Sequence, residues 1–203
     1  MVRLAVSVEG QTEERFIKEV ITPHLQGWEI YAYPVLLGRS GGDVSIPRVR
    51  KDLMNLLGSF DKVTTFYDFY GFRGKEEGES KESLERKILD CVENYSHGRL
   101  IPYVQMYEFE GLLFSSPEAL ENNILPHSGL SDWARQVVGE FGKNPETIND
   151  SEHSAPSKRL SDRARYIKTI HGPDIASEIG LDVLREKCRG FGKWLSELEK
   201  LGA

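Results

Sequence analysis

Residues 2–13 read Val2-Arg3-Leu4-Ala5-Val6-Ser7-Val8-Glu9-Gly10-Gln11-Thr12-Glu13. The fold that we expect of this chain follows first from this stretch. Residues 2–8 are few, apolar and rich in valine, which is typical of a buried strand rather than a helix. Gly10 allows a sharp turn, and Thr12 can cap a helix. From residue 13 to residue 25 the apolar side chains recur at helical spacing. The chain therefore begins as strand, tight turn and helix.

Three further stretches have the length and the β-branched or aromatic content of strands, and they alternate with helical patterns. The strands are expected at residues 30–37, 62–68 and 100–106, and the helices between them at 47–57 and 82–95. This alternation predicts an α/β fold with a mostly parallel, Rossmann-like central sheet and helices on both faces. After Phe114 the expected elements are helices, at 118–122, 131–141, 158–171, 174–179, 181–188 and 191–201.

No repeat or low-complexity linker divides the 203 residues, and a single core can still grow at this length. We expect an α/β core over residues 1–114 and a helical C-terminal extension over residues 115–203 that packs on it, the two forming one structural domain. Two polar stretches, residues 71–80 and 144–157, are interpreted as functional loops.

The composition argues against several classes of protein. Apolar residues make up 39% and charged residues 29%, and no window approaches the roughly 20 apolar residues of a membrane span. The N-terminus carries no charged leader, so we expect a cytoplasmic protein. A formal charge of −6 does not indicate a basic surface for nucleic acid, but it suits a protein whose carboxylates hold divalent cations. The chain has no GxxxxGK[ST] pattern, so P-loop nucleotide hydrolysis is not expected.

Acidic side chains follow three of the predicted strands. Glu9 ends the first strand, Asp68 ends the third, and Glu108 and Glu110 follow the fourth. Glu13 lies at the start of the first helix, where the helix dipole favours an anion. Glu108 and Glu110 share one side if the chain is still extended there, and separate if a helix has begun. Because the carboxyl ends of parallel strands meet at one edge of a sheet, up to five carboxylates are expected together.

Such a cluster repels itself. Two unit charges about 4 Å apart repel by about 1 kcal/mol in water and by about 4 kcal/mol at an effective dielectric constant near 20. Oxygen ligands without histidine suit hard cations, so the expected cofactor is Mg²⁺ or Mn²⁺. Such ions bridge a phosphate, activate a water molecule and stabilise the leaving oxygen, which indicates phosphodiester chemistry. Taken singly, each acid has a plain alternative as a helix cap or a surface ion pair; their recurrence at strand ends favours the metal site.

Four motifs follow one another along nearly the whole chain: Val8-Glu9-Gly10-Gln11-Thr12-Glu13, Tyr67-Asp68-Phe69-Tyr70-Gly71, Tyr107-Glu108-Phe109-Glu110-Gly111-Leu112-Leu113-Phe114 and Ala155-Pro156-Ser157-Lys158-Arg159-Leu160. In these motifs the sequence resembles the uncharacterised DUF4276 family, which is considered Toprim-like. Toprim domains occur in topoisomerases, primases and the overcoming-lysogenization-defect nucleases. The resemblance implies that Glu9 is the Toprim glutamate, that Glu13 is the second acid used by those nucleases, and that Asp68 is the first acid of an Asp-x-Asp motif.

The sequence departs from the wider superfamily at two positions. Tyr70 replaces the second aspartate of Asp-x-Asp, which removes one expected ligand. Glu108 or Glu110 could supply it, and one-metal catalysis is the alternative to a two-metal site. Tyr107 stands where a histidine is expected in the family, which weakens a proton-transfer role there.

Several basic side chains are expected near the site. The candidates for binding the substrate are Arg48, Arg73, Lys75 and Arg159. Lys158 follows a Ser-Ala-Pro-Ser turn and is the candidate for stabilising negative charge on the transferred phosphate, so Glu9 and Lys158 are the predicted catalytic residues. The alternative is that Ser157 caps a helix and that Lys158 and Arg159 are solvated.

These features predict a Mg²⁺- or Mn²⁺-dependent nuclease, or a related phosphoryl-transfer enzyme, that acts on DNA or RNA. The resemblance to the overcoming-lysogenization-defect nucleases implies a role in bacterial phage defence with a separate ABC-type ATPase. One alternative is a catalytically weak Toprim-like module that binds nucleic acid or regulates a partner, and another is a small-molecule phosphotransfer enzyme. The sequence leaves open the choice of DNA or RNA, the number of metals and the oligomeric state.

Overall fold

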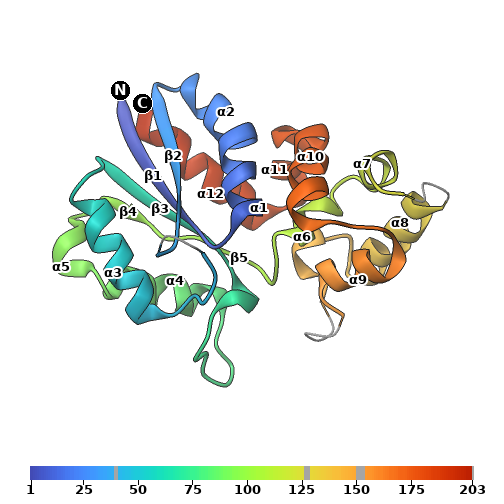
Figure 1. Cartoon of the computed structure of the whole chain (residues 1–203), viewed down its shortest axis with the longest axis horizontal. Helices are drawn as coiled ribbons and strands as arrows, with labels where there is room; N and C mark the ends of the chain where they lie inside the picture. Colours follow the sequence, from blue (N-terminus) through green and yellow to red (C-terminus); the bar gives the residue numbers. More distant parts are fainter. Residues whose placement is uncertain (39–40, 126–128, 150–153, 203) are drawn as a thin grey trace.

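A parallel sheet organises the N-terminal half of the computed structural model, which describes residues 1–38, 41–125, 129–149 and 154–202 (Figure 1). Its strands are β1 (Val2–Val8), β2 (Ile30–Leu36), β3 (Lys62–Asp68), β4 (Leu100–Ile101) and β5 (Val104–Gln105). Their order is β2-β1-β3-β4, with β5 also paired to β3, and every pairing is parallel. The predicted α/β fold is therefore confirmed.

The pleat of the central strands divides the apolar side chains between two cores. In β1, Leu4, Val6 and Val8 belong to one core, while Ala5 belongs to the other. Both sets are fully buried, as expected for a parallel sheet whose two faces are covered by helices. The strand therefore reads as a continuous apolar run rather than as an alternation of apolar and polar residues.

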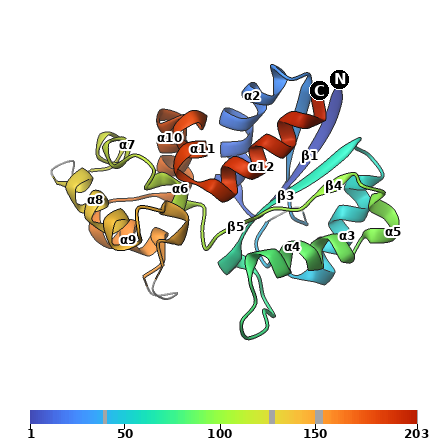
Figure 2. The same ribbon diagram turned by 180° about the vertical axis from the view of Figure 1, so that it is seen from behind.

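Helices cover both faces of the sheet (Figures 1 and 2). One core holds the first helical stretch, which runs as α1 (Gln11–Phe16), a π-helical segment (Ile17–Ile21) and α2 (Thr22–Gln26), together with α12 (Arg189–Glu199). The other core holds α3 (Ile46–Leu57) and α4 (Lys81–Asp90). α4 begins at a capping box in which the Ser80 hydroxyl accepts from the backbone of Ser83.

The remaining helices lie mostly in the C-terminal half (Figure 1). They are a 3₁₀ turn (Phe69–Gly71), α5 (Glu93–Ser96), α6 (Glu110–Leu113), α7 (Pro117–Asn123), α8 (Leu130–Glu140), a 3₁₀ turn (Pro145–Thr147), α9 (Pro156–Arg163), α10 (Lys168–Ile179), α11 (Leu181–Lys187) and a 3₁₀ turn (Lys200–Gly202).

Three predicted elements are divided in the structure. The strand expected at 100–106 is split into β4 and β5 around Pro102, which has no N–H to donate to a ladder. The helix expected at 82–95 ends at Asp90, and α5 follows separately. The helix expected at 158–171 is broken after Arg163, because Ala164 is extended at φ −150°, and its end joins the helix expected at 174–179 to form the single helix α10 (Lys168–Ile179), which runs through Pro173. This last break places Lys168 at the start of a new helix.

The C-terminal half returns to the sheet through α12. The indole N–H of Trp194 donates to the Thr64 hydroxyl of β3 at 2.9 Å, and its ring stacks on Tyr103 with centroids 4.9 Å apart. The boundary drawn at residue 114 stays a prediction.

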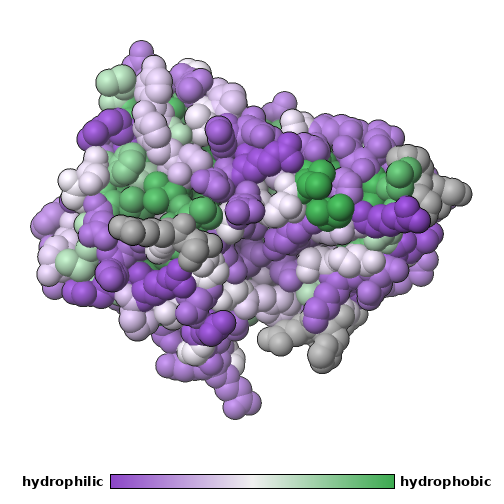
Figure 3. All heavy atoms as spheres, viewed as in Figure 1, coloured by the Kyte–Doolittle hydropathy of each residue, from purple (hydrophilic) through white to green (hydrophobic). Residues whose placement is uncertain are grey.

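On the face seen in Figure 3 the surface is mostly hydrophilic, with apolar patches in both halves. Among the described residues no helix combines the length and the apolar character that crossing a membrane requires.

A candidate metal centre at the carboxyl edge of the sheet

Glu9 and Asp68 lie at the carboxyl ends of two neighbouring parallel strands, because β1 pairs with β3 as far as Val8 and Phe66. The backbone N–H of Asp68 donates to Glu9 Oε2 at 3.3 Å, which holds the two residues together. Gly71 leaves the room for this contact, since a Cβ atom there would lie 2.1 Å from Glu9 Oε2. The turn that follows β3 is thus shaped around the Glu9 carboxylate.

Glu13 and Glu110 bring two more buried carboxylates to this edge. Glu13 lies in the first turn of α1 and is 2% exposed, and Glu110 begins α6 and is 0% exposed. α6 is tied to the sheet because the Phe109 backbone N–H donates to Asp68 Oδ1 at 2.8 Å. Acidic side chains from β3, α1 and α6 therefore lie together although they are far apart in sequence.

Lys168, the first residue of α10, lies at the centre of this group and was not among the predicted site residues. Its Nζ atom is 3.3 Å from Glu110 Oε2, 3.6 Å from Asp68 Oδ2 and 3.9 Å from Glu13 Oε1. We call Glu9, Glu13, Asp68 and Glu110 the carboxylate cluster. No local sequence pattern marks Lys168, because its partners come from three other elements.

Tyr166 fixes the orientation of Glu110 in the carboxylate cluster. Its hydroxyl donates to Glu110 Oε1 at 3.0 Å, so the other oxygen, Oε2, faces Lys168. Within the described part of the chain, Glu110 Oε2 and Glu13 Oε1 are buried and have no hydrogen-bond partner. Buried polar atoms normally find partners, so these two oxygens indicate a place for a cation.

Burial raises the pKa of three of these carboxylates, Glu9, Asp68 and Glu110. Burial, followed by the charge of Glu13, raises the pKa of Glu9 to about 7. Burial also raises the pKa of Glu110, and it raises the pKa of Asp68 well above its usual value. Burial opposes the charge of Lys168, but Glu110, Asp68 and Glu13 outweigh it, so the pKa of Lys168 lies well above its usual range. The environment favours a proton or a cation among these carboxylates.

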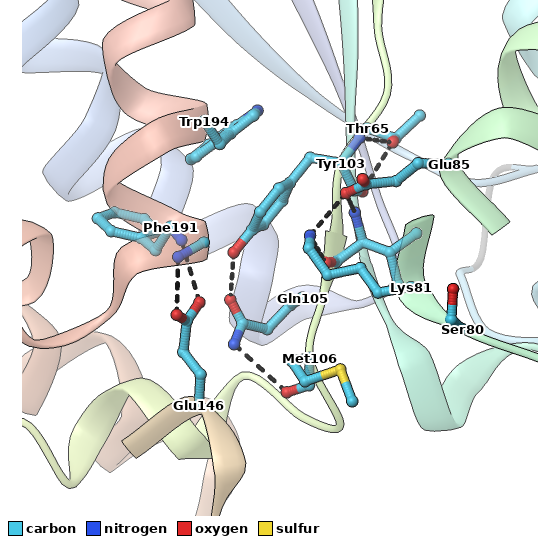
Figure 4. Close-up of polar contacts among 12 residues, drawn as sticks. Thr65, Ser80, Lys81, Glu85, Tyr103, Gln105, Met106, Glu146, Phe191 and Trp194 are labelled. Carbon is cyan, nitrogen blue, oxygen red and sulfur yellow. Dashed lines mark hydrogen bonds and ion pairs between the residues drawn. The ribbon is translucent and has the colours of Figure 1, made fainter. Parts of the chain in front are cut away.

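Two sets of hydrogen bonds lie near β5, one within the chain that leads to Glu110 and one at the start of α12 (Figure 4). The Tyr103 hydroxyl donates to Gln105 Oε1 at 2.6 Å, and Gln105 Nε2 donates to the Met106 carbonyl at 3.4 Å. The Glu146 carboxylate accepts from the backbone N–H groups of Gly190 and Phe191 at 2.7 and 3.0 Å, at the N-terminus of α12.

Lys81 also contacts the chain that leads to Glu110. Its ammonium lies 3.9 Å from the centre of the Tyr103 ring and 2.6 Å from Glu85 Oε1, and Glu85 Oε1 also accepts from the Val104 backbone N–H at 3.0 Å. The strand segment before Glu110 is thus held from α4 on one side and from α12 on the other.

The structure separates Glu108 from Glu110, because the helix has begun at Glu110. Glu108 Oε2 accepts from the Ser157 backbone N–H at 2.9 Å, at the start of α9, and it makes no ion pair with Lys168 within 4 Å among the described contacts. Of the two glutamates, Glu110 is the one that joins the carboxylate cluster. Glu108 is held at its rim.

The two tyrosines that depart from the superfamily pattern pack against each other. The rings of Tyr70 and Tyr107 have centroids 5.4 Å apart, and the Tyr70 backbone N–H donates to the Tyr107 carbonyl at 3.0 Å. Tyr107 has a φ of 58°, which is uncommon for a bulky residue and marks the sharp turn after β5. Neither side chain supplies the missing carboxylate.

The predicted basic residues are spread around this edge. Arg48 donates to the carbonyls of Leu37 and Gly41, so it holds the loop after β2, and Arg73 pairs with Asp43 at 2.9 Å. Their substrate-binding roles stay predictions.

The other predicted cations lie on two segments. Lys75 donates to the Phe72 carbonyl at 2.5 Å, and Arg159 donates to the Ser154 carbonyl at 2.6 Å. Lys158, near the start of α9, is exposed. Most of the 144–157 loop is described, but residues 150–153 lie outside the described residues.

The donors fit a hard cation, because all four are carboxylates, three are almost fully buried and two oxygens lack hydrogen bonds. Their present arrangement is organised around Lys168. Among the described residues, no three His, Cys, Asp or Glu side chains are already grouped to hold a metal ion. A divalent ion would therefore need these carboxylates to close further than they do around the ammonium.

Residues 8–199 match the sequence model of a family described as "Domain of unknown function (DUF4276)". No curated protein matches the sequence. Among solved structures, the C-terminal region of the Burkholderia pseudomallei OLD protein is similar over 100% of both chains, with 14% identity and a TM-score of 0.51. The C-terminal region of the Xanthomonas campestris pv. campestris OLD protein is similar over 99% of this chain and 94% of that chain, with 16% identity and a TM-score of 0.49. The first of these likenesses supports the fold, and the resemblance found in the sequence is confirmed.

Proposed function

The chain belongs to the DUF4276 family, and we propose that it is a divalent-metal-dependent nuclease of the Toprim type, or a related enzyme that transfers phosphoryl groups of phosphodiesters. The observation that carries this proposal is the carboxylate cluster, in which buried acids from three elements face one point at the carboxyl edge of the sheet. Burying several carboxylates together is costly unless cations neutralise them.

In this proposal Glu9 and Asp68 hold one Mg²⁺ or Mn²⁺, and Glu13 and Glu110 are ligands for a second ion. When bound, the ion would polarise a phosphodiester and lower the pKa of a water nucleophile. Lys158 is retained as the group that stabilises negative charge on the phosphate, since it is exposed near the start of α9 and follows Ser157, whose backbone contacts Glu108. Glu108, which accepts a hydrogen bond from the Ser157 backbone, then links the start of α9 to the edge of the sheet where the metal would bind.

A second candidate function is a Toprim-like module that binds nucleic acid without cutting it. The observation that favours it is the ammonium of Lys168 among the carboxylates, together with Tyr70 in place of an acid. Nucleic acid as the partner, a role in phage defence and a separate ABC-type ATPase follow from the resemblance and stay predictions.

Cleavage assays separate these two functions. The protein is incubated with supercoiled plasmid and with single-stranded RNA, in Mn²⁺ or in EDTA. We expect Mn²⁺-dependent nicking or RNA cleavage that EDTA abolishes. The Glu9→Gln variant should lose activity by at least about 100-fold, because one metal ligand is removed.

Glu14→Gln is the matched control. Glu14 is an acid in the first turn of α1, as Glu13 is, but it lies outside the carboxylate cluster. It should cleave like the wild type. Cleavage that is equally strong in EDTA, or unchanged in Glu9→Gln, would overturn the proposal. Tight binding without cleavage, in Mn²⁺, would support the binding module instead.

A further inference from the structure

Three carboxylate oxygens from three different elements converge on one nitrogen atom, Nζ of Lys168. They are Glu110 Oε2 at 3.3 Å, Asp68 Oδ2 at 3.6 Å and Glu13 Oε1 at 3.9 Å. The glutamate oxygens have no hydrogen-bond partner within the described ranges, so nothing else there satisfies them. Oxygens from separate elements that face one point define a position for a cation.

The Lys168 ammonium lies too far from the three oxygens to form strong hydrogen bonds with them. Its distances to the three oxygens exceed the 2.7–2.9 Å that is typical, as a rough guide, of a charge-assisted hydrogen bond. Hard divalent cations approach carboxylate oxygens to about 2.0–2.6 Å. A divalent ion at this position would therefore draw the same oxygens inward and satisfy them more completely than Lys168 does.

Lys168 lies on the solvent side of the position it fills. Its side chain is 42% exposed, whereas those of Glu13, Asp68 and Glu110 are 3%, 7% and 0% exposed. The lysine can therefore swing outward without opening the apolar core. Tyr166 keeps its own hydrogen bond to Glu110 Oε1, so Glu110 stays oriented when the ammonium leaves.

We propose that Lys168 is a resident cation of the carboxylate cluster, filling the position between Glu13, Asp68 and Glu110. This inference rests on the proposed function. The protein binds one divalent ion, at Glu9 and its neighbours, and binds a second only when Lys168 leaves. Lys168 thereby takes the place of a second ion in a site where Tyr70 stands instead of an acid.

Calorimetric titration of the full chain with Mn²⁺ tests this through the number of ions bound. We expect one Mn²⁺ per chain in the wild type and two in Lys168→Met, which has a neutral side chain of similar length. Lys18→Met is the matched control, because Lys18 is exposed on the first helical stretch, and it should bind one ion. Lys168→Arg keeps the positive charge and should also bind one.

Thermal melting gives a second readout that needs no activity. Without metal, Lys168→Met leaves three carboxylates without their cation, so its melting temperature should fall below that of Lys18→Met, and Mn²⁺ should raise it by more than it raises the wild type. If Lys168→Met folds only in Mn²⁺, the Mn²⁺ content per chain after desalting replaces the titration, and two ions remain the expected result.

The outcomes separate the two proposals. Two ions in the wild type, or one ion in a folded Lys168→Met, would overturn the role of Lys168 and leave the metal site standing. No Mn²⁺ bound by the wild type or by any variant would instead overturn the metal site of the proposed function, and with it the inference built on it.

Discussion

At the scale of single residues, the candidate site is governed by the balance between buried negative charge and the cations that offset it. Asp68 and Glu110 are almost fully buried, and burial raises the pKa of both. Lys168 is the cation that the fold itself supplies. Burying these carboxylates is therefore electrostatically unfavourable, and Lys168 offsets part of that cost.

Most of the carboxylate cluster could be predicted from the sequence, because Glu9, Asp68 and Glu110 follow strands whose ends must meet. Lys168 could not be predicted. Its segment was interpreted as the inside of a longer helix, and its contacts depend on how α10 packs against α1. The assignment of Glu110 rather than Glu108 also needed the structure, since it depends on where α6 begins.

Glu9 should make the metal-free protein less stable as the pH rises. Its pKa is raised from 4.5 to about 7 in the folded state, so between these values the folded protein binds more protons than the unfolded chain. The free energy of unfolding therefore falls with rising pH, by up to about 1.4 kcal/mol per pH unit for this group. Glu9→Gln removes that contribution. In EDTA it should be more stable than the wild type at pH 8 and closer to it at pH 5.

Urea unfolding at the two pH values measures this difference, and Glu14→Gln should follow the wild type. A Glu9→Gln variant that is less stable than the wild type at pH 8 in EDTA would mean that the ionised Glu9 carboxylate does not destabilise the folded protein.

At the scale of elements, long and strongly patterned segments were predictable, whereas the interruptions, apart from the one at Pro102, were not. β1, β2, β3 and α3 lie within one residue of the expected ranges, because each has a continuous apolar pattern. The splitting of residues 158–171 into α9 and α10 has no local signal as strong, and it is this break that brings Tyr166 and Lys168 to the carboxylates. Local pattern fixes where helices can form, while tertiary contacts decide where they break.

Arg15 should hold the start of α10 against α1. Its guanidinium pairs with Asp174 at 2.5 Å and donates to the Ile170 carbonyl at 2.9 Å. Hydrogen bonds from a charged donor contribute about 1.5–3 kcal/mol, but exposed ion pairs contribute less, so we expect Arg15→Met to lose about 1 kcal/mol of stability.

Amide hydrogen exchange should localise that loss to the first turns of α10. Arg86→Met, at an exposed position on α4, is the control and should leave both the stability and the exchange of α10 unchanged. Uniform loss of protection across the sheet would contradict a local role for Arg15.

At the scale of the whole molecule, the two halves of the chain meet at the candidate site. The carboxyl edge of the sheet supplies Glu9 and Asp68, α1 supplies Glu13, and the C-terminal half supplies Glu110 and Lys168. The fold class and the position of the site at the carboxyl edge follow from strand order alone. The formal charge of −6 is consistent with a protein that carries cations when it meets a polyanion.

Anomalous diffraction at the manganese absorption edge, from crystals grown with Mn²⁺, tests the central claim that the carboxylate cluster binds a divalent metal. We expect an anomalous peak within roughly 2.0–2.6 Å of carboxylate oxygens that include Glu9, with Lys168 still beside Glu110 when a single peak is present. Well-ordered carboxylates with no peak among them, at millimolar Mn²⁺, would contradict it.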